Sequence, residues 1–375
     1  MAINSYHRFN LLLMPAIALG VVGIGVFNTA VNPYGILPSP EVQRLNALKP
    51  SQFNNVRLFK AVDIKRLQPQ SVILGSSRAD LGIDPTHPAI QQAGKAYNLG
   101  IVGPNMYEVR RYFDHAIANQ PDLKQVVLGL DFFMFSENLE NAPDFNERRL
   151  GRTTIEPKDL FRSLFSVNAL DSSLTTLEAN LRADAEYLYR PDGMRYVYGD
   201  RLNGPLDNRF PGMTARLTQL YYDDFELSEK HLADFQAIVD TCEERGIELK
   251  IFISPEHATA LAALQESGRW QEFEDWKRQI VAIAPVWDFS GFNTVTTEPI
   301  SETMVNYWDS SHYTKAVGDL ILNRIFDYET ASVPSDFGVL LSEENLEAHL
   351  IQVRSQKLAW LQEHPLTRQV SYQQN

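Results

Sequence analysis

The strongest pattern in the sequence is a long apolar run near its beginning. No charged residue lies between Arg8 and Glu41, and residues 11–27 are almost entirely apolar. About 20 apolar residues are enough for a helix to cross the hydrocarbon core of a bilayer. We therefore predict one transmembrane helix over residues 9–31.

Two other interpretations of this run are weaker. A buried core helix rarely runs this long without a charge, and a signal peptide usually has a shorter apolar stretch that ends at a small-x-small site. Residues 28–30 make a poor cleavage site, so we expect an uncleaved anchor. Arg8 precedes the run, and the next basic residue is Arg44. This asymmetry predicts a cytoplasmic segment 1–8 and an extracytoplasmic, periplasmic remainder.

Beyond the anchor, short apolar runs alternate with longer amphipathic ones. We expect strands within 71–82, 125–135, 247–253 and 286–289, and helices over 104–119, 228–245, 314–326 and from Ser342 to about 363. Strands that alternate with helices predict an α/β fold with a mostly parallel central sheet, covered by helices on both faces. In such sheets ligands bind at the carboxyl ends of the strands.

The same pattern divides the chain into segments. We expect a linker and entry segment over 32–69, the α/β domain over 70–330 and a helical extension over 331–375. Residues 140–225 interrupt the alternation and are rich in Arg, Asp, Asn, Tyr and Gly. We interpret them as an insertion near the active face.

Composition then limits the classes of function. The chain of 375 residues holds 47 acidic and 34 basic side chains, a net charge of −13, which argues against binding to nucleic-acid phosphates. A single cysteine, Cys242, excludes an intrachain disulfide and a cysteine zinc cluster. The eight histidines show no paired ligand spacing, so we expect no metal and no cofactor.

Three polar motifs fall at predicted strand ends or before helices. They are Gly-Ser-Ser-Arg at 75–78, Asn-Leu-Gly-Ile-Val-Gly-Pro-Asn at 98–105 and Asp-Ser-Ser-His at 309–312. A serine hydroxyl is a weak nucleophile that needs a base, and histidine held by a carboxylate supplies one. Asp309 and His312 are three residues apart on a predicted turn, which allows their side chains to lie side by side. The tight turn after Gly75 would project a serine, and backbone N–H groups of Ser77 and Gly103 are suited to bind an oxyanion.

In this order and spacing, the GSSR, NLGIVGPN, LGLD and DSSH motifs resemble the blocks of SGNH/GDSL hydrolases. The resemblance implies a three-layer αβα fold with a flavodoxin-like strand order. It assigns the catalytic triad to Ser77, Asp309 and His312. It assigns an oxyanion-binding N–H to Gly103, with Gly100 as the alternative.

Two positions depart from the family pattern. Ser76 replaces the aspartate of the first block, and Asp131 stands where the third block has an asparagine that donates to the oxyanion. An ionised carboxylate cannot donate a hydrogen bond. We therefore expect Asn105, or else Asn98, to supply that donor.

The anchor, the Asn-Pro-Tyr-Gly sequence after it, the GSS turn and the late DSSH are most similar to a membrane-anchored SGNH subgroup. This subgroup includes the alginate O-acetylation proteins and the teichoic-acid D-alanyl transfer protein. The resemblance implies a serine esterase or O-acyltransferase that acts on an acylated cell-envelope polysaccharide or another ester, with a membrane-bound O-acyltransferase as a possible partner. The alternative is a non-catalytic envelope protein of the same fold that binds polysaccharide or a partner enzyme.

Four further residues are candidates for substrate contact: Arg78, Asp131, His257 and Trp308. Arg78 suits an acidic substrate, and Trp308 beside the DSSH motif suits stacking on a sugar. Each also has a structural interpretation: an ion pair for Arg78, backbone contacts for Asp131, a satisfied buried histidine for His257 and core packing for Trp308.

The triad residues have structural interpretations as well. Ser77 and Asp309 are both suited to capping a helix N-terminus, and His312 to a cap or the surface. Which interpretation holds depends on whether the three side chains meet.

Overall fold

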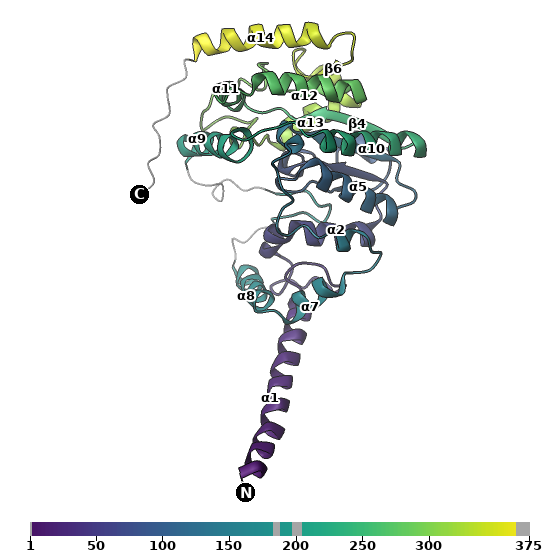
Figure 1. Cartoon of the computed structure of the whole chain (residues 1–375), viewed down its shortest axis with the longest axis vertical. Helices are drawn as coiled ribbons and strands as arrows, with labels where there is room; N and C mark the ends of the chain where they lie inside the picture. Colours follow the sequence, from purple (N-terminus) through teal and green to yellow (C-terminus); the bar gives the residue numbers. More distant parts are fainter. Residues whose placement is uncertain (1, 183–187, 197–204, 365–375) are drawn as a thin grey trace. The chain divides into compact units, whose positions relative to one another are not determined.

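The computed structural model describes residues 2–182, 188–196 and 205–364 (Figure 1). The chain forms two compact units. The first consists of Met1–Gln68 and Asp144–Pro191, and the second of Pro69–Pro143 and Asp192–Asn375. The predicted insertion at 140–225 is therefore divided, because residues 144–191 belong with the N-terminal segment and its two ends with the α/β unit.

A six-stranded sheet forms the centre of the second unit, in the order β2-β1-β3-β4-β5-β6. The strands are β1 Ser71–Leu74, β2 Ala96–Asn98, β3 Gln125–Leu130, β4 Glu248–Ile253, β5 Val286–Asp288 and β6 Val339–Leu341. The first five are parallel, and β6 pairs antiparallel with β5. The predicted mostly parallel α/β sheet is confirmed, and the order of its first five strands is that of flavodoxin-like doubly wound folds.

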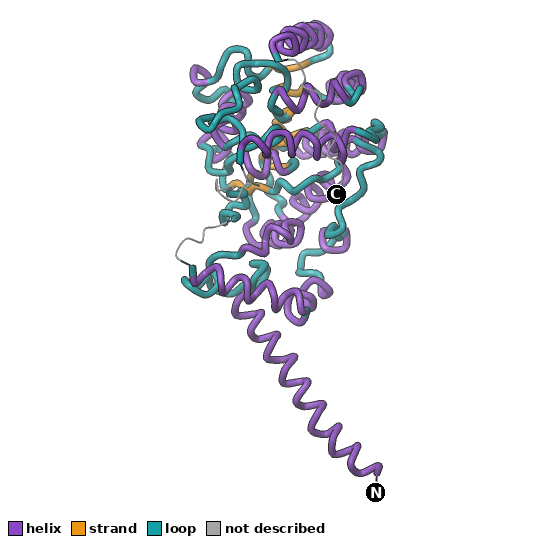
Figure 2. Tube along the Cα trace, turned by 90° about the vertical axis from the view of Figure 1, so that its left-hand side faces the viewer, coloured by secondary structure: helices purple, strands orange, loops and turns teal. Residues whose placement is uncertain are grey.

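Helices lie on both sides of this sheet (Figure 2). They include α3 Ser77–Gly82, α4 Pro88–Gln91, α5 Met106–Asn119, α9 Leu206–Leu217, α10 Glu229–Arg245, α11 Ala258–Glu266, α12 Trp270–Ile283, α13 Lys315–Ile325 and α14 Leu346–Glu363. One packed set consists of α5, α10, α12 and α14, and a second of α3, α4 and α13. Strands β1 and β3 are buried along their whole length, as expected for central strands that are covered on both faces.

Local sequence explains where several elements begin and end. Helix α10 begins after Ser228, whose side chain accepts from the backbone N–H of His231, and it ends at Gly246 in the left-handed conformation with φ 64°. Helix α5 begins after Asn105, which caps it in the same way. Both predicted helices are confirmed to within two residues at each end.

Other boundaries differ from the predictions. The strand expected to reach residue 135 ends at Leu130, because residues 132–135 turn into a short 3-10 helix. The extension expected to be helical first adds β6 to the sheet edge and only then forms α14. The three-residue strand β2 was not predicted, since its apolar pattern is too short to stand out.

The first unit is helical in the part of it that the structure describes. Its helices are α1 Ala2–Val31, α2 Val56–Leu67, α6 Glu147–Leu150, α7 Pro157–Phe165 and α8 Val167–Leu181, with a 3-10 turn at Pro50–Asn55. Residues Tyr6–Val31 are long and apolar enough to cross a membrane. The expected linker over 32–69 is instead folded, because residues 56–64 of α2 are all buried. This unit also holds a cavity of about 220 Å³ beside the Asn32–Gly35 turn.

Candidate active site

The turn after β1 separates the two adjacent serines. Gly75 has φ 144°, and a Cβ there would lie 2.9 Å from the Ala79 Cβ and 3.0 Å from the Gly129 carbonyl oxygen, so only glycine fits. Ser76 is buried, and its Oγ caps α3 by accepting from the backbone N–H of Arg78 at 3.1 Å. Ser77, the first residue of α3, is only half-buried. Of the pair, Ser77 alone is partly exposed.

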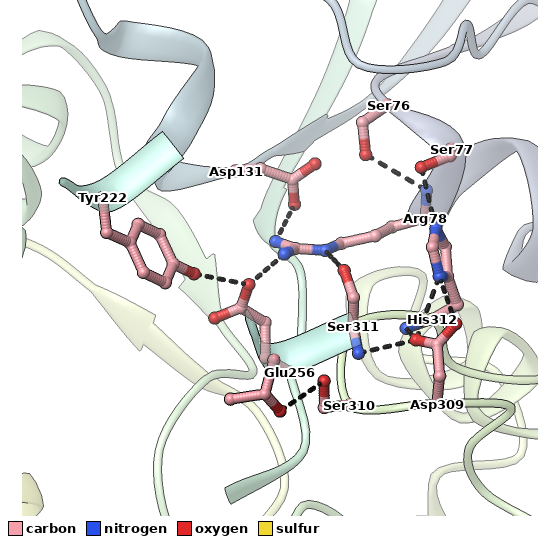
Figure 3. Close-up of polar contacts among 11 residues, drawn as sticks. Ser76, Ser77, Arg78, Asp131, Tyr222, Glu256, Asp309, Ser310, Ser311 and His312 are labelled. Atoms are coloured by element: carbon pink, nitrogen blue, oxygen red, sulfur yellow. Dashed lines mark hydrogen bonds and ion pairs between the residues drawn. The ribbon is translucent and has the colours of Figure 1, made fainter. Parts of the chain in front are cut away.

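The structure brings Ser77, His312 and Asp309 together at the carboxyl end of the sheet (Figure 3). Ser77 Oγ lies 2.9 Å from His312 Nε2, and His312 Nδ1 lies 2.9 Å from Asp309 Oδ2. A carboxylate only accepts, so Nδ1 of the neutral ring carries the hydrogen and Nε2 accepts from the Ser77 hydroxyl. This is the order of contacts that a serine nucleophile, its base and an orienting carboxylate require.

Asp309 is held in its charged form. Burial alone would raise the pKa of Asp309, but the neighbouring His312 ring and hydrogen bonds from His312 and from the backbone of Ser311 and His312 outweigh it and keep the pKa below its usual value. The backbone N–H groups of Ser311 and His312 both donate to Asp309 Oδ1 at 2.8 Å. Asp309 therefore closes its own turn and orients the histidine at the same time.

A close helix crossing brings the two turns together. Helix α3 begins at Ser77, and α13 begins three residues after His312. They pack so tightly that a Cβ on Gly318 would lie 1.8 Å from the carbonyl oxygen of Gly82. No larger residue fits at Gly318, and this contact sets the distance between the serine turn and the histidine turn.

The loop after β2 lies beside the serine turn, because the N–H of Ile101 donates to the carbonyl of Gly75 at 3.0 Å. In this loop Gly103 has a left-handed backbone with φ 54°. Within the described ranges, no hydrogen-bond acceptor engages the backbone N–H of either Ser77 or Gly103. Both groups are thus uncommitted, and their binding of an oxyanion stays a prediction.

The other oxyanion candidates are occupied. The N–H of Gly100 donates to Asn98 Oδ1 at 2.9 Å, and Asn98 Nδ2 donates to the carbonyls of Ala79 and Ile83. Asn98 thereby ties α3 to the loop after β2 and is a structural residue.

Asn105 does not fit its predicted role either. Its Oδ1 caps α5, and its Nδ2 donates to Leu139 O and Asn141 Oδ1, both at 2.9 Å. Both amide hydrogens are used inside the protein. The expectation that Asn105 donates to an oxyanion is therefore corrected.

Arg78 is the centre of a buried ionic cluster rather than a surface group for substrate. Its side chain is 3% exposed; Nη1 donates to Asp131 Oδ1 at 2.9 Å, Nη2 to Glu256, and Nε to Ser311 Oγ at 3.1 Å (Figure 3). Ser311 lies between Asp309 and His312 in the same turn. Arg78, which directly follows Ser77, therefore connects the serine turn to the turn that holds His312.

The cluster also accounts for Asp131. Its side chain is 1% exposed and pairs with Arg78, so it is not placed to contact a substrate as predicted. Its second oxygen, Oδ2, is buried with no hydrogen-bond partner in the part of the chain that the structure describes. The buried carboxylate of Asp131 is thus matched by a buried arginine.

Glu256 and Tyr222 complete the cluster. The Tyr222 hydroxyl donates to Glu256 Oε1 at 3.3 Å, and burial raises the pKa of both groups, although Arg78 opposes the shift. Sequence analysis missed Glu256, Tyr222 and Ser311. Two of them carried a signal, because Glu256 follows the predicted strand 247–253 by three residues and Ser311 lies inside the motif at 309–312.

The structure bears on the predicted substrate contact of His257 but leaves that of Trp308 open. His257 is buried and caps α11, with Nδ1 2.9 Å from Thr259 Oγ1 and Nε2 2.9 Å from the Glu298 carbonyl oxygen. Both ring nitrogens are engaged, which corrects the predicted substrate contact. Trp308 is half-buried beside Asp309, and its contact with a sugar stays a prediction.

No protein-family model fits the chain, and no curated protein is significantly similar to it. The case for a function therefore rests on the geometry of the site. Over residues 2–182, 188–196 and 205–364, no group of three or more His, Cys, Asp or Glu side chains is arranged to hold a metal ion.

We predict that Arg78→Met destabilises the protein by about 3–5 kcal/mol at about pH 8, because it leaves two buried carboxylates without their cation. The loss of Arg78 raises the pKa of Glu256 further, so the folded variant binds protons more tightly than the unfolded chain. Its free energy of unfolding then falls as the pH rises, and the loss is smaller at about pH 5. Urea unfolding at both pH values measures this.

Arg110→Met on α5 is the matched control. Arg110 is partly exposed and pairs with Asp234, so its removal costs about 0.2–1 kcal/mol. A loss for Arg78→Met that equals the control, or that grows on acidification, contradicts the role of the cluster.

Proposed function

We propose that this protein is a serine esterase or O-acyltransferase of the SGNH type. The single observation that carries the proposal is the continuous contact from Ser77 through His312 to Asp309, with 2.9 Å at each step. It is supported by the uncommitted N–H groups of Ser77 and Gly103 and by the strand order of the sheet. The motif resemblance described above points to the same chemistry.

The mechanism follows from these contacts. His312 Nε2 takes the proton of Ser77 as Oγ attacks the acyl carbonyl carbon, and the Asp309 carboxylate stabilises the imidazolium that forms. The N–H groups of Ser77 and Gly103 stabilise the oxyanion of the tetrahedral intermediate. His312 then returns the proton to the leaving alcohol, which gives an acyl-serine. Attack on that ester by water completes hydrolysis, and attack by a sugar hydroxyl completes transfer.

The proposed location is the outer face of the membrane that α1 crosses. The excess of positive charge before the span favours a cytoplasmic N-terminus. An acylated envelope polysaccharide is then the proposed substrate or acceptor, and a membrane-bound O-acyltransferase is the proposed supplier of acyl groups.

One observation favours a second candidate, a non-catalytic protein that binds polysaccharide or a partner enzyme. The family's oxyanion asparagine is replaced by Asp131, which is committed to Arg78 and cannot donate. In that case Ser77 would have no acyl-transfer reactivity, and labelling by a serine-reactive probe separates the two candidates.

We expect a fluorophosphonate probe to label Ser77 in the full-length protein. Ser77→Ala abolishes labelling because it removes the attacking oxygen. Ser76→Ala is the matched control: it removes only a helix cap, costs about 1 kcal/mol of stability and leaves labelling intact. Mapping of the adduct by mass spectrometry checks this. Labelling at Ser76, or no labelling of the folded protein, supports the non-catalytic candidate instead.

We expect Asp309→Ala and His312→Ala each to lower p-nitrophenyl acetate turnover by orders of magnitude while the circular dichroism spectrum is retained. Because residues of a triad act as a unit, the double variant should be about as impaired as His312→Ala alone. Steady-state kinetics of the three variants measures this. If the double loss equals the product of the single losses, the two residues act independently and the triad assignment is wrong.

We expect alkaline phosphatase fused after Asn375 to be active in cells and green fluorescent protein fused there to be dark, because the span directs the C-terminal part of the chain out of the cytoplasm. The same fusions in a chain that lacks residues 9–31 are the control and should show the reverse. An inactive phosphatase with a bright fluorescent fusion on the full-length chain would contradict the orientation.

A further inference from the structure

Helices α7 and α8 expose large apolar side chains within the first unit. The two helices form a hairpin, the α7–α8 hairpin, and the large apolar side chains exposed on it are Phe161, Phe165, Val167, Leu174 and Leu181. Phe161 is 64% and Val167 81% exposed, and the rings of Phe161 and Phe165 are in contact, with 5.3 Å between their centroids. Residues four apart share one face of a helix, so the two rings form a continuous apolar surface.

This hairpin, residues 157–181, holds the end of α1. Asn28 Nδ2 donates to the Leu164 carbonyl at 2.8 Å, and Asn28 Oδ1 accepts from Ser173 Oγ at 2.7 Å. The Phe165 ring packs against Gly25, where a Cβ would lie 2.4 Å from it. Figure 1 shows α7 and α8 flanking the end of α1.

The contacts divide α1 into two parts. Gly25, Asn28 and Val31 are buried against the protein, whereas the earlier apolar residues, such as Leu12 and Leu19, are more than 70% exposed. The exposed part is the surface that lipid covers if α1 spans a membrane. The apolar face of the hairpin thus begins where the lipid-facing part of α1 ends.

The exposed charged side chains around α7 are mostly basic, whereas the chain as a whole is acidic. Within residues 147–165 the exposed charged side chains are Glu147, Arg148, Arg152, Lys158 and Arg162, so all but one are basic. The two other acids there, Glu156 and Asp159, are buried; Glu156 caps α7 and Asp159 pairs with Arg149. Basic side chains that flank exposed aromatic residues are typical of helices that lie at a membrane interface with anionic lipids.

We propose that the α7–α8 hairpin is embedded in the interfacial region of the leaflet where α1 leaves the bilayer. Phe161, Phe165 and Val167 lie among the acyl chains, and Lys158 and Arg162 lie at the lipid phosphates. The hairpin thereby fixes the first unit on the membrane surface by a second contact besides the span. The proposal rests on α1 as a membrane anchor and is independent of the catalytic proposal.

The test places an environment-sensitive fluorophore on single cysteines in the full-length protein, reconstituted in vesicles that contain phosphatidylglycerol. Phe161→Cys and Val167→Cys report on the hairpin, and Leu358→Cys, an exposed apolar position on α14, is the matched control. Native Cys242 does not interfere, because it is buried and burial raises the pKa of its thiol to about 12. Nitroxide-labelled lipids and aqueous iodide are the two quenchers, and circular dichroism checks the fold.

The proposal expects the probes at 161 and 167 to be quenched several-fold more strongly by nitroxide lipids than the probe at 358, with the order reversed for iodide. Equal accessibility of all three probes to iodide, with no lipid quenching, would overturn it. Protection from iodide without lipid quenching, increasing with the protein-to-lipid ratio, would also overturn it and assign the face to a second copy of the chain. Because the probes at 161 and 167 lie on different helices, a local perturbation by one substitution does not decide the result.

Discussion

The arrangement of the candidate active site depends on one buried guanidinium. Arg78 follows the nucleophile candidate directly and reaches Asp131 after β3, Glu256 after β4 and Ser311 in the histidine turn. A buried cation is tolerated only when its donors are satisfied, so these partners have to converge on it. The same requirement positions the ends of three parallel strands and the Asp309–His312 turn relative to Ser77.

Close backbone approaches complete this geometry. Gly75 lets the chain turn sharply out of β1, and the contact of Gly318 with Gly82 lets α13 lie directly on α3. The ion pairs and hydrogen bonds of Arg78 determine which loops meet, and these glycines determine how near the loops come. Together they bring two residues that are 235 positions apart in the sequence to 2.9 Å. The buried polar groups around Arg78 therefore stabilise the geometry of the candidate active site as well as the core.

Helix α1 is part of a folded unit. Residues 144–191 fold with it into a unit of their own, and Asn28 within the apolar run is satisfied by Leu164 and Ser173. An amide at the end of a membrane-spanning segment would otherwise need water or lipid headgroups as partners. The α7–α8 hairpin supplies these partners, and so it couples the end of α1 to the rest of the first unit.

The sequence alone determined what depends on local pattern. The apolar run before Asn32 predicted a long apolar helix, uniform apolar stretches predicted β1 and β3, and cap residues predicted α10. The motifs also singled out Ser77, Asp309 and His312, which the fold brings into contact. Tertiary structure alone decided the parts played by Arg78 and Asn105, because a polar side chain of either type suits a substrate or a buried partner equally well. Their hydrogen-bond partners lie up to 233 residues away, and no local pattern records which distant group satisfies which.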